Sequence, residues 1–482
     1  MKHIDFIERK LYSYNELLCL FSQDREALNK TLGTAISKNI FKIKTSTTRD
    51  EEIKENSFLL EDEEIIKEEK YSEYLYYTEY VGLIVVNSYV LKIYPKYFLN
   101  AEDIPNDSFK DVIKVLKKYK SLFQNSDIFN DISLPKKYRE FVVELSVMTD
   151  YLKEGIYEDN HRVIEKNGNG EILWDRTIND NIPYLVDKTP YYLETVTRRN
   201  YKNSRNYFKL LHEAIITNCF RKFNKMGLLG VFSMPNIFIS EKKLSDFGSL
   251  SEILYNIENE LNIQFSSRRK TILNLMYIYV AKKDSLYKVD EIGIYATRKF
   301  ENVWEKALKD VLDTDYNKTL KTMLGSMNEK SYESFELATL DSIIDKPIWN
   351  INGNNISAET YVLDILKISK DKKILNIYDA KYYVPKISED KSKITHQPGI
   401  QDISKQFFYE LAYKKLIERS YITEIQNYFL LPKTQDKNPE INISMEMFKR
   451  IGVGKINVLF LDPKKVFSAY LDNRIVDVKD LI

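Results

Sequence analysis

Apolar residues recur three and four positions apart near the start of the chain, in residues 15–21 (NELLCLF) and 28–43 (LNKTLGTAISKNIFKI). This spacing is typical of helices that bury one face. We therefore expect residues 1–48 to form a small helical module, for which a winged helix is one option. Residues 50–73 follow with eleven acidic residues, which indicates a solvated linker or an exposed helix more than a binding site.

The next segment changes from helical spacing to nearly continuous apolar runs. Residues 80–97 (YVGLIVVNSYVLKIYPKY) predict two buried strands around a turn at Asn87-Ser88. Helical spacing then returns in two segments, residues 109–123 and 138–154. Together these elements predict a β/α module over residues 74–160.

The middle of the chain combines a turn signal with long helical patterns. The stretch RVIEKNGNGEILWDRTI (162–178) predicts a β-hairpin, because its Asn and Gly residues suit a tight turn between two strands. Amphipathic helices are predicted at residues 204–226 and 249–282. Residues 161–290 are thus expected to form a hairpin followed by a helical region.

An acid and a lysine interrupt an apolar strand further on, in ILNIYDAKYYVPK (374–386). Asp379 and Lys381 are two residues apart, so the period of a strand places them on one face. The preceding strand, TYVLDILKI (360–368), carries Asp364, and the short polar segment between the strands suits a hairpin loop. Antiparallel pairing would therefore bring Asp364 close to Asp379.

This arrangement of Asp364, Asp379 and Lys381 is the pattern of the PD-(D/E)xK nuclease core. Two bare carboxylates ~4 Å apart repel by roughly 4 kcal/mol at an effective dielectric constant near 20. A divalent cation removes that conflict, and Mg²⁺, with Mn²⁺ as an alternative, prefers oxygen ligands. The lysine would then position or activate the water that attacks phosphorus. The alternative is a surface hairpin whose Asp–Lys pair faces water.

A helix upstream offers a third carboxylate for this metal site. Residues 298–312 (RKFENVWEKALKDVL) are amphipathic, with Glu301 and Glu305 one helical turn apart. Nucleases of this core often direct a glutamate from the preceding helix toward the metal. Glu305 is the preferred candidate because it follows Trp304 at the edge of the apolar stripe, although a solvated acid on the helix face is the competing interpretation.

A second helix follows the predicted site, after the break at Pro398-Gly399. Its sequence, DISKQFFYELAYKKLI, places Gln406, Tyr409 and Tyr413 on one face. That face suits contacts of Gln406 and Tyr413 with a DNA backbone or with Lys381. A helix that only packs against the sheet is the alternative.

The composition narrows the class of protein. The chain has 482 residues, a formal net charge of +1 and two cysteines, so it predicts several domains and excludes a disulfide framework. No signal peptide or membrane-spanning run is evident, which leads us to expect a cytoplasmic protein with no membrane contact. The four histidines (His3, His161, His212 and His396) are scattered, which argues against a His-based nuclease.

DNA binding must therefore come from local basic clusters, because the chain has no global positive field. The candidates are two groups of residues, Arg198, Arg199, Lys202, Arg205 and Lys209, and then Arg268, Arg269 and Lys270. Arginine can grip a phosphate through two hydrogen bonds at once. The same clusters could instead face solvent or meet an acidic surface of a partner ATPase.

Four segments together resemble the LlaJI-type restriction endonuclease family, relatives of McrC: NGNGEILWDRTI, FENVWEKAL, DAKYY and GIQDISKQFFYELAYKKLI…YFLLP. The segment LKIYPKY is similar to an I-x-P-K segment of McrC-like proteins. The resemblance implies an α+β multidomain chain, with a McrC-like mixed α/β and helical region followed by a PD-(D/E)xK domain over residues 291–482. It also implies Mg²⁺-dependent DNA cleavage in which Asp364, Asp379 and Lys381 form the core set, with Glu305 as a further ligand.

The resemblance further implies a McrB-like AAA+ GTPase partner. The sequence itself contains no G-x-x-x-x-G-K-[ST] motif, since GVGKIN (452–457) is too short and lacks the Ser/Thr. The leading hypothesis is the nuclease subunit of a nucleotide-dependent restriction system, with a homodimer as one route to double-strand cleavage. A non-catalytic adaptor that activates the AAA+ partner and clamps DNA is the alternative, and a stand-alone repair nuclease is a third.

Overall fold

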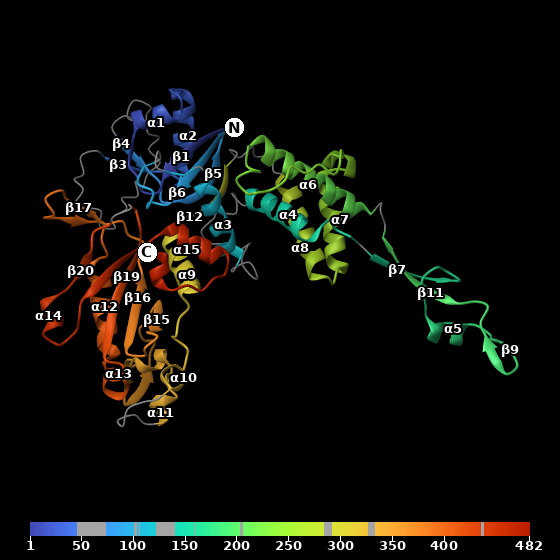
Figure 1. Cartoon of the computed structure of the whole chain (residues 1–482). Helices are drawn as coiled ribbons and strands as arrows, with labels where there is room; N and C mark the ends of the chain where they lie inside the picture. Colours follow the sequence, from blue (N-terminus) through green and yellow to red (C-terminus); the bar gives the residue numbers. More distant parts are fainter. Residues whose placement is uncertain are drawn as a thin grey trace. The chain divides into compact units, whose positions relative to one another are not determined.

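The computed structural model describes residues 1–45, 74–100, 104–105, 107–121, 140–158, 160–202, 206–283, 292–325, 333–434 and 438–482 (Figure 1). Met1 aside, the chain forms two compact units. The middle unit comprises Ile132–Tyr295. The other, which we call the split unit, combines Lys2–Asp131 with Ala296–Ile482. Both contain helices and strands, so the predicted α+β multidomain organisation is confirmed. The predicted division of the chain into four parts stays a prediction.

The N-terminal part of the split unit is built on a small sheet. β5 (Val81–Val86) and β6 (Tyr89–Tyr94) pair antiparallel around a turn at Asn87, whose φ is 53°. The two predicted strands and their turn are therefore confirmed. The elements around them are β2 (Tyr12–Ser13), α1 (Tyr14–Leu20), α2 (Arg25–Ser37), β3 (Lys42–Thr45), β4 (Tyr74–Tyr77) and α3 (Ser108–Ser121).

The first six residues after Met1 differ from the predicted helical module. They form β1 (Lys2–Ile7), which pairs in parallel with β6. Ile4 and Phe6 are buried at alternate positions, as expected of a strand with one covered face. α1 and α2 confirm the helical pattern of residues 15–43 only in part, because a strand precedes them and β3 follows. The acidic run at 50–73 lies outside the described residues.

The C-terminal part of the split unit contains a five-stranded mixed sheet of order β15-β16-β19-β21-β20. The hairpin strands β15 and β16 are antiparallel, β16, β19 and β21 are parallel to one another, and β20 is antiparallel to β21. The bounds are β15 (Ile365–Ile368), β16 (Ile374–Ala380), β19 (Glu424–Pro432), β20 (Ile441–Ile443) and β21 (Ile456–Leu461).

Helices cover both faces of this sheet (Figure 1). α12 (Ile400–Ala412) packs on one face, where Phe407 meets Phe429 and Leu431 of β19. α9 (Phe300–Leu312) lies on the other face, and its Trp304 indole N–H donates to the Leu430 carbonyl at 3.3 Å. α15 (Pro463–Leu471) packs beside α9 through Phe467.

Shorter elements complete this part of the split unit. They are α10 (Leu320–Leu324), α11 (Glu333–Glu336), β13 (Ile348–Ile351), β14 (Asn354–Ser357), β17 (Lys386–Ile387), β18 (Ile394–Thr395), α13 (Lys414–Arg419) and α14 (Glu446–Lys449). β12 (Ile292–Thr297) is the strand in which the chain passes from the middle unit back to the split unit.

Four helices form the body of the middle unit: α4 (Glu140–Glu154), α6 (Tyr207–Lys225), α7 (Leu250–Ile263) and α8 (Ser267–Lys283). The helical patterns predicted in this region are confirmed. Gly155, with φ of 84°, follows the end of α4, and a capping box between Ser249 and Glu252 opens α7. No helix in the part of the chain that the structure describes is long and apolar enough to cross a membrane.

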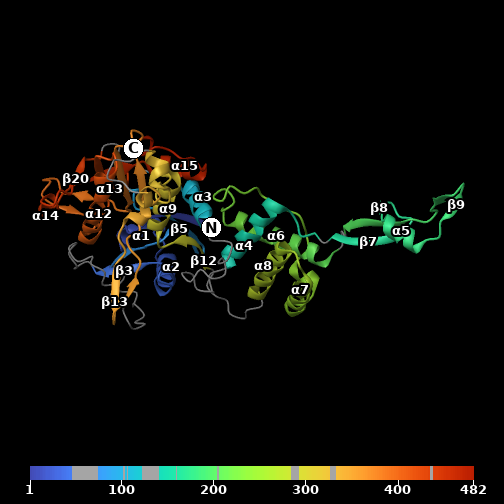
Figure 2. The same ribbon diagram turned by 90° about the horizontal axis from the view of Figure 1, so that it is seen from below.

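The predicted hairpin at 162–178 is wrong in its pairing. β7 (Asn160–Lys166) and β8 (Glu171–Ile172) both pair with a third strand, β11 (Val196–Lys202), which lies between them. A seven-residue ladder with β11 offers β7 more hydrogen bonds than the two-residue β8 could. The remaining stretch forms α5 (Trp174–Asp180), followed by β9 (Tyr184–Val186) and β10 (Thr189–Tyr191). Figures 1 and 2 show these elements extending as an arm from the helices of the same unit.

Candidate active site

The two predicted aspartates meet where β15 begins and β16 ends. Asp364 directly precedes β15, and its Oδ2 accepts a hydrogen bond from the Ala380 backbone N–H at 3.0 Å. This contact explains why β15 is shorter than the predicted strand 360–368, since the Asp364 side chain takes the amide that a longer ladder would use. The hairpin itself is confirmed, with Ile365 opposite Tyr378.

Burial and the neighbouring acid make Asp379 hard to ionise. The residue as a whole is 8% exposed. Burial first, and then the charge of Asp364, raise the pKa of Asp379 to about 7, although Lys381 opposes the shift. A carboxylate pair of this kind has a charge conflict that a cation would relieve.

Lys381 is held between two carboxylates. Its Nζ lies 2.8 Å from Asp379 Oδ2 and 3.0 Å from Asp402 Oδ1. Burial lowers the pKa of Lys381, but the two carboxylates outweigh burial and keep the pKa above its usual value. Asp402, in the first turn of α12, was not identified from the sequence, where an acid at a helix start needs no function.

Glu305 reaches this group only through a second lysine. Lys309 Nζ lies 2.6 Å from Glu305 Oε1 and 3.1 Å from Asp364 Oδ1. Burial lowers the pKa of Lys309, yet the two acids raise it above its usual value. Glu301, the other candidate on α9, is exposed and acts electrostatically on Lys96 instead. Lys309, one helical turn after Glu305, was not singled out from the sequence.

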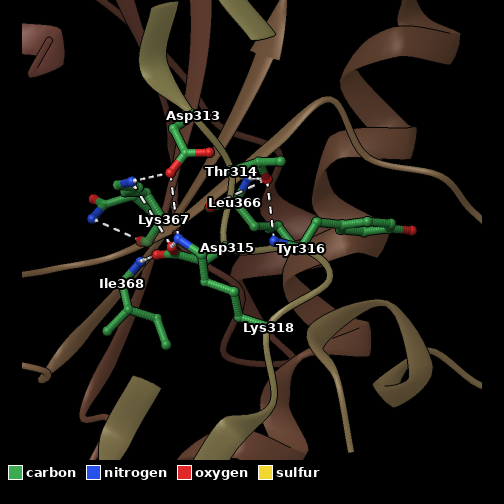
Figure 3. A network of polar contacts seen from close by, with 9 residues as sticks. Asp313, Thr314, Asp315, Tyr316, Lys318, Leu366, Lys367 and Ile368 are labelled. Carbon is green, nitrogen blue, oxygen red and sulfur yellow. Dashed lines mark hydrogen bonds and ion pairs between the residues drawn. The ribbon is translucent and has the colours of Figure 1, made fainter. Parts of the chain in front are cut away.

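The segment after α9 fixes this helix against β15 (Figure 3). The Asp315 backbone N–H donates to the Leu366 carbonyl at 2.8 Å, and Asp315 Oδ2 accepts from the Ile368 N–H at 3.1 Å. Lys318 Nζ lies 2.8 Å from Asp315 Oδ1, and Lys367 Nζ 3.8 Å from the same oxygen. These bonds set the distance between the helix that carries Glu305 and the strand that follows Asp364.

The residues present fit a magnesium ion only in part. Asp364 and Asp379 supply two hard oxygen donors whose mutual repulsion a cation would relieve, and Mg²⁺ is commonly bound by one or two carboxylates plus water and phosphate. Within the ranges that the structure describes, no three acids, histidines or cysteines converge as a metal site. Glu305 would have to leave Lys309 to become the third ligand.

The residues predicted to contact DNA from α12 lie in the core. Gln406 and Tyr413 are both 0% exposed. The Tyr413 hydroxyl donates to the Leu340 carbonyl at 2.9 Å, and the Gln406 amide lies 3.4 Å from Asn427 Oδ1. These two are corrected to packing residues, because a side chain without exposed surface cannot reach a phosphate. Tyr409 shares their face, as predicted.

The basic clusters are less uniform than their sequence suggests. Arg198 is paired with Glu171 at 2.6 Å, and Arg199 follows it in β11. Arg268 donates to the Gly155 carbonyl at 2.7 Å, which ties it to the end of α4. Arg269 lies in the first turn of α8, and Arg205 lies outside the described residues. DNA contact by Arg198, Arg199, Arg205, Arg268 and Arg269 stays a prediction.

Comparisons with known proteins agree with this picture at the level of family. The chain is 24% identical over 437 residues to the type II restriction enzyme BsuMI component YdjA of Bacillus subtilis, covering 88% of this chain and 87% of that protein. Two solved assemblies from Thermococcus gammatolerans are also similar. One is McrB AAA+ hexamers with bound McrC, at a TM-score of 0.36, 14% identity and complete coverage of both chains.

The other assembly is the McrBC complex, at a TM-score of 0.21 and 13% identity, covering 60% of this chain and 89% of that one. The family model described as LlaJI restriction endonuclease matches residues 80–474, which include every residue of the candidate site. This match confirms the resemblance drawn from the sequence motifs. The chain belongs to the LlaJI restriction endonuclease family.

Proposed function

We propose that this chain is the nuclease subunit of a nucleotide-dependent restriction system and hydrolyses DNA phosphodiester bonds with Mg²⁺. The observation that carries the proposal is the Asp364–Asp379 pair beside Lys381 at one end of the hairpin. A clamp without catalytic activity has no need for two adjacent acids, one of them buried with a raised pKa. Membership of a restriction endonuclease family supports the same function.

Each residue of the PD-(D/E)xK set has a role in this proposal. Asp364 and Asp379 would hold Mg²⁺, which would offset the charge that develops on the phosphate. Lys381 would donate hydrogen bonds to the attacking water and orient its oxygen toward phosphorus. Asp379 and Asp402 hold the Lys381 ammonium in place before substrate arrives. Lys309 would steady Asp364 and could then meet a phosphate.

The proposal includes a McrB-like AAA+ GTPase as partner. The chain has no P-loop motif of its own, so energy from nucleotide hydrolysis would have to come from another subunit. Its relative in Bacillus subtilis is named as a component of a restriction enzyme, which suits a protein that works with others. Two copies of the chain would allow both DNA strands to be cut.

The test is plasmid cleavage in Mg²⁺ by the chain together with its partner and GTP or ATP. We expect Asp379→Asn to lower the cleavage rate at least about a hundredfold. Removing a single group that stabilises charge in the transition state typically lowers a rate by about 10²–10³. The matched control is Asp371→Asn, an exposed acid in the turn at the opposite end of the same hairpin. It should cut at the wild-type rate.

Two outcomes would contradict the proposal. If wild type never cuts but stimulates nucleotide hydrolysis by the partner as well as Asp379→Asn does, the adaptor function is the correct one. If Asp379→Asn cuts as fast as wild type, the active site lies elsewhere. Thermal unfolding of both variants, measured alongside, separates loss of chemistry from loss of the fold.

A further inference from the structure

The residue after Lys381 is anchored to the start of the chain. Tyr382 is 5% exposed, and its hydroxyl donates to Glu8 Oε2 at 2.7 Å. Glu8 directly follows β1 and is itself 3% exposed. These two residues are 374 positions apart in the sequence and belong to the same split unit.

Lys96, in the segment LKIYPKY, contacts both Glu8 and Tyr382. Its backbone N–H lies 3.1 Å from both Glu8 Oε2 and the Tyr382 hydroxyl. Its ammonium lies over the ring of Tyr382, 4.3 Å from the centroid. Phe300 of α9 also contacts this ring, with centroids 5.4 Å apart. Tyr382 is therefore held by Glu8 at its hydroxyl, by the Lys96 ammonium over its ring face and by the ring of Phe300.

The contact of Glu8 and Lys96 with Tyr382, which we call the joint, includes a buried acid, and this makes its geometry specific. Burial raises the pKa of Glu8, while Lys96 and the Tyr382 hydroxyl oppose the shift. Removing one partner of a buried ionic group leaves an uncompensated charge, which is strongly unfavourable. The joint therefore has one good geometry, and that geometry sets where the chain runs after Lys381.

The backbone around Lys381 depends on such contacts because β16 ends at Ala380. The Lys381 N–H still donates to the Leu430 carbonyl at 3.0 Å, but residues 381–385 form no further strand. The Tyr383 hydroxyl lies 3.5 Å from Asp402 Oδ2, whose other oxygen holds Lys381. The backbone at Lys381 is thus held by its hydrogen bond to β19 and by the contacts of Tyr382 and Tyr383, the two residues that follow.

We propose that Glu8 and Lys96 are positioning residues for Lys381 and act through Tyr382. Neither touches the reacting atoms. Together they make the N-terminal sheet part of the support of the active site, and they give the LKIYPKY segment a role that the cleavage chemistry alone does not. The proposal rests on the nuclease function for its consequence, but its geometry can be tested without cleavage.

The test measures how readily Lys381 reacts with an acylating reagent, with the modified residue identified by mass spectrometry. In the wild-type full-length chain the Lys381 Nζ is paired with two carboxylates and its side chain is only 19% exposed, so it should react slowly. In Tyr382→Phe, loss of the hydrogen bond to Glu8 should loosen the backbone that follows Lys381 and raise the reactivity of Lys381 about tenfold or more. Glu8→Ala, which removes the acceptor of the Tyr382 hydroxyl and the charge beside Lys96, should raise the reactivity of Lys381 in the same way.

The matched control is Tyr157→Phe in the middle unit. Tyr157 is 0% exposed, and its hydroxyl lies 3.0 Å from Glu260 Oε1, so the substitution removes the same kind of bond elsewhere. Its Lys381 should react as in wild type. Unchanged reactivity in Tyr382→Phe, or an equal rise in Tyr157→Phe, would overturn the proposal.

Cleavage assays then connect the joint to function. With wild type active, Tyr382→Phe should lower the single-turnover rate about tenfold while the Mg²⁺ dependence of thermal unfolding stays the same. A wild-type rate in Tyr382→Phe would also overturn the proposal. If wild type never cuts, the nuclease function fails, whereas the acylation result still decides whether Glu8 and Lys96 position Lys381.

Discussion

At the scale of single residues, Asp379 is a group whose protonation changes near neutral pH. Its pKa of about 7 lies above the ordinary value of 3.8. The folded protein therefore keeps a proton that the unfolded chain has already lost, and the free energy of unfolding should fall as the pH rises from about 4 to about 7. Above that range both states are ionised, and the stability should change no further through this group.

Magnesium should reverse that loss. Because the ion binds the ionised carboxylates, we expect Mg²⁺ to raise the unfolding temperature more at pH 8 than at pH 6, with affinity falling about tenfold per pH unit below about 7. Differential scanning calorimetry at several Mg²⁺ concentrations measures this. Asp379→Asn should abolish the effect and Asp371→Asn should retain it, and an equal Mg²⁺ effect in both variants would exclude Asp379 as a ligand.

The sequence predicted the site at this scale through residue types and the period of strands. Asp364, Asp379 and Lys381 come together as expected, because a hairpin with a short loop leaves few alternatives. Asp402 and Lys309 escaped prediction because charged residues on helix surfaces are common and their direction depends on tertiary packing. Gln406 and Tyr413 were misplaced for the opposite reason, since polar groups on an apolar helix face can find hydrogen-bond partners inside the core, as the Gln406 amide N–H does at Asn427 and the Tyr413 hydroxyl does at Leu340.

At the scale of elements, α9 connects the sheet core with the charged groups of the site. Trp304 is 0% exposed and packs against Phe467 while its indole N–H binds the Leu430 carbonyl. Trp304→Ala should lower the free energy of unfolding by about 3–5 kcal/mol through the cavity that it leaves. Chemical denaturation measures this loss.

The control for that experiment lies on the exposed side of the same helix. Lys306 pairs with Asp310 one turn later, so Lys306→Ala should cost only about 0.3–0.5 kcal/mol. Comparable losses in both variants would mean that α9 is not anchored through Trp304. α9 could be predicted from its periodicity. The pairing of the strand at 160–166 could not, because its partner β11 lies beyond the predicted turn and carries no pairing signal in the sequence.

At the scale of the whole molecule, the split unit joins the two ends of the chain. Phe6 of β1 is 1% exposed and contacts the rings of Tyr12 and Phe41. Phe6→Ala should therefore lower the same thermal transition that Trp304→Ala lowers, and it should weaken the Mg²⁺ effect at that transition. Separate transitions for the two variants would show that the N-terminal sheet unfolds independently of the site. No local pattern in residues 2–7 predicts that β1 pairs with β6, because the sequence of one strand does not specify a partner strand far away in the chain.

The joint of Glu8 with Tyr382 also affects the synthesis of the chain. A ribosome releases Glu8 early and reaches Tyr382 only after a further 374 residues, which takes roughly 20–75 s at 5–20 residues per second. During that time Glu8 has no Tyr382 hydroxyl to bind, and the nascent chain lacks β16, which directly precedes Lys381. Premature termination or proteolysis of the growing chain before this point would release fragments that lack both Asp379 and Lys381. Under the proposed nuclease function, incomplete chains would therefore be unable to cut DNA.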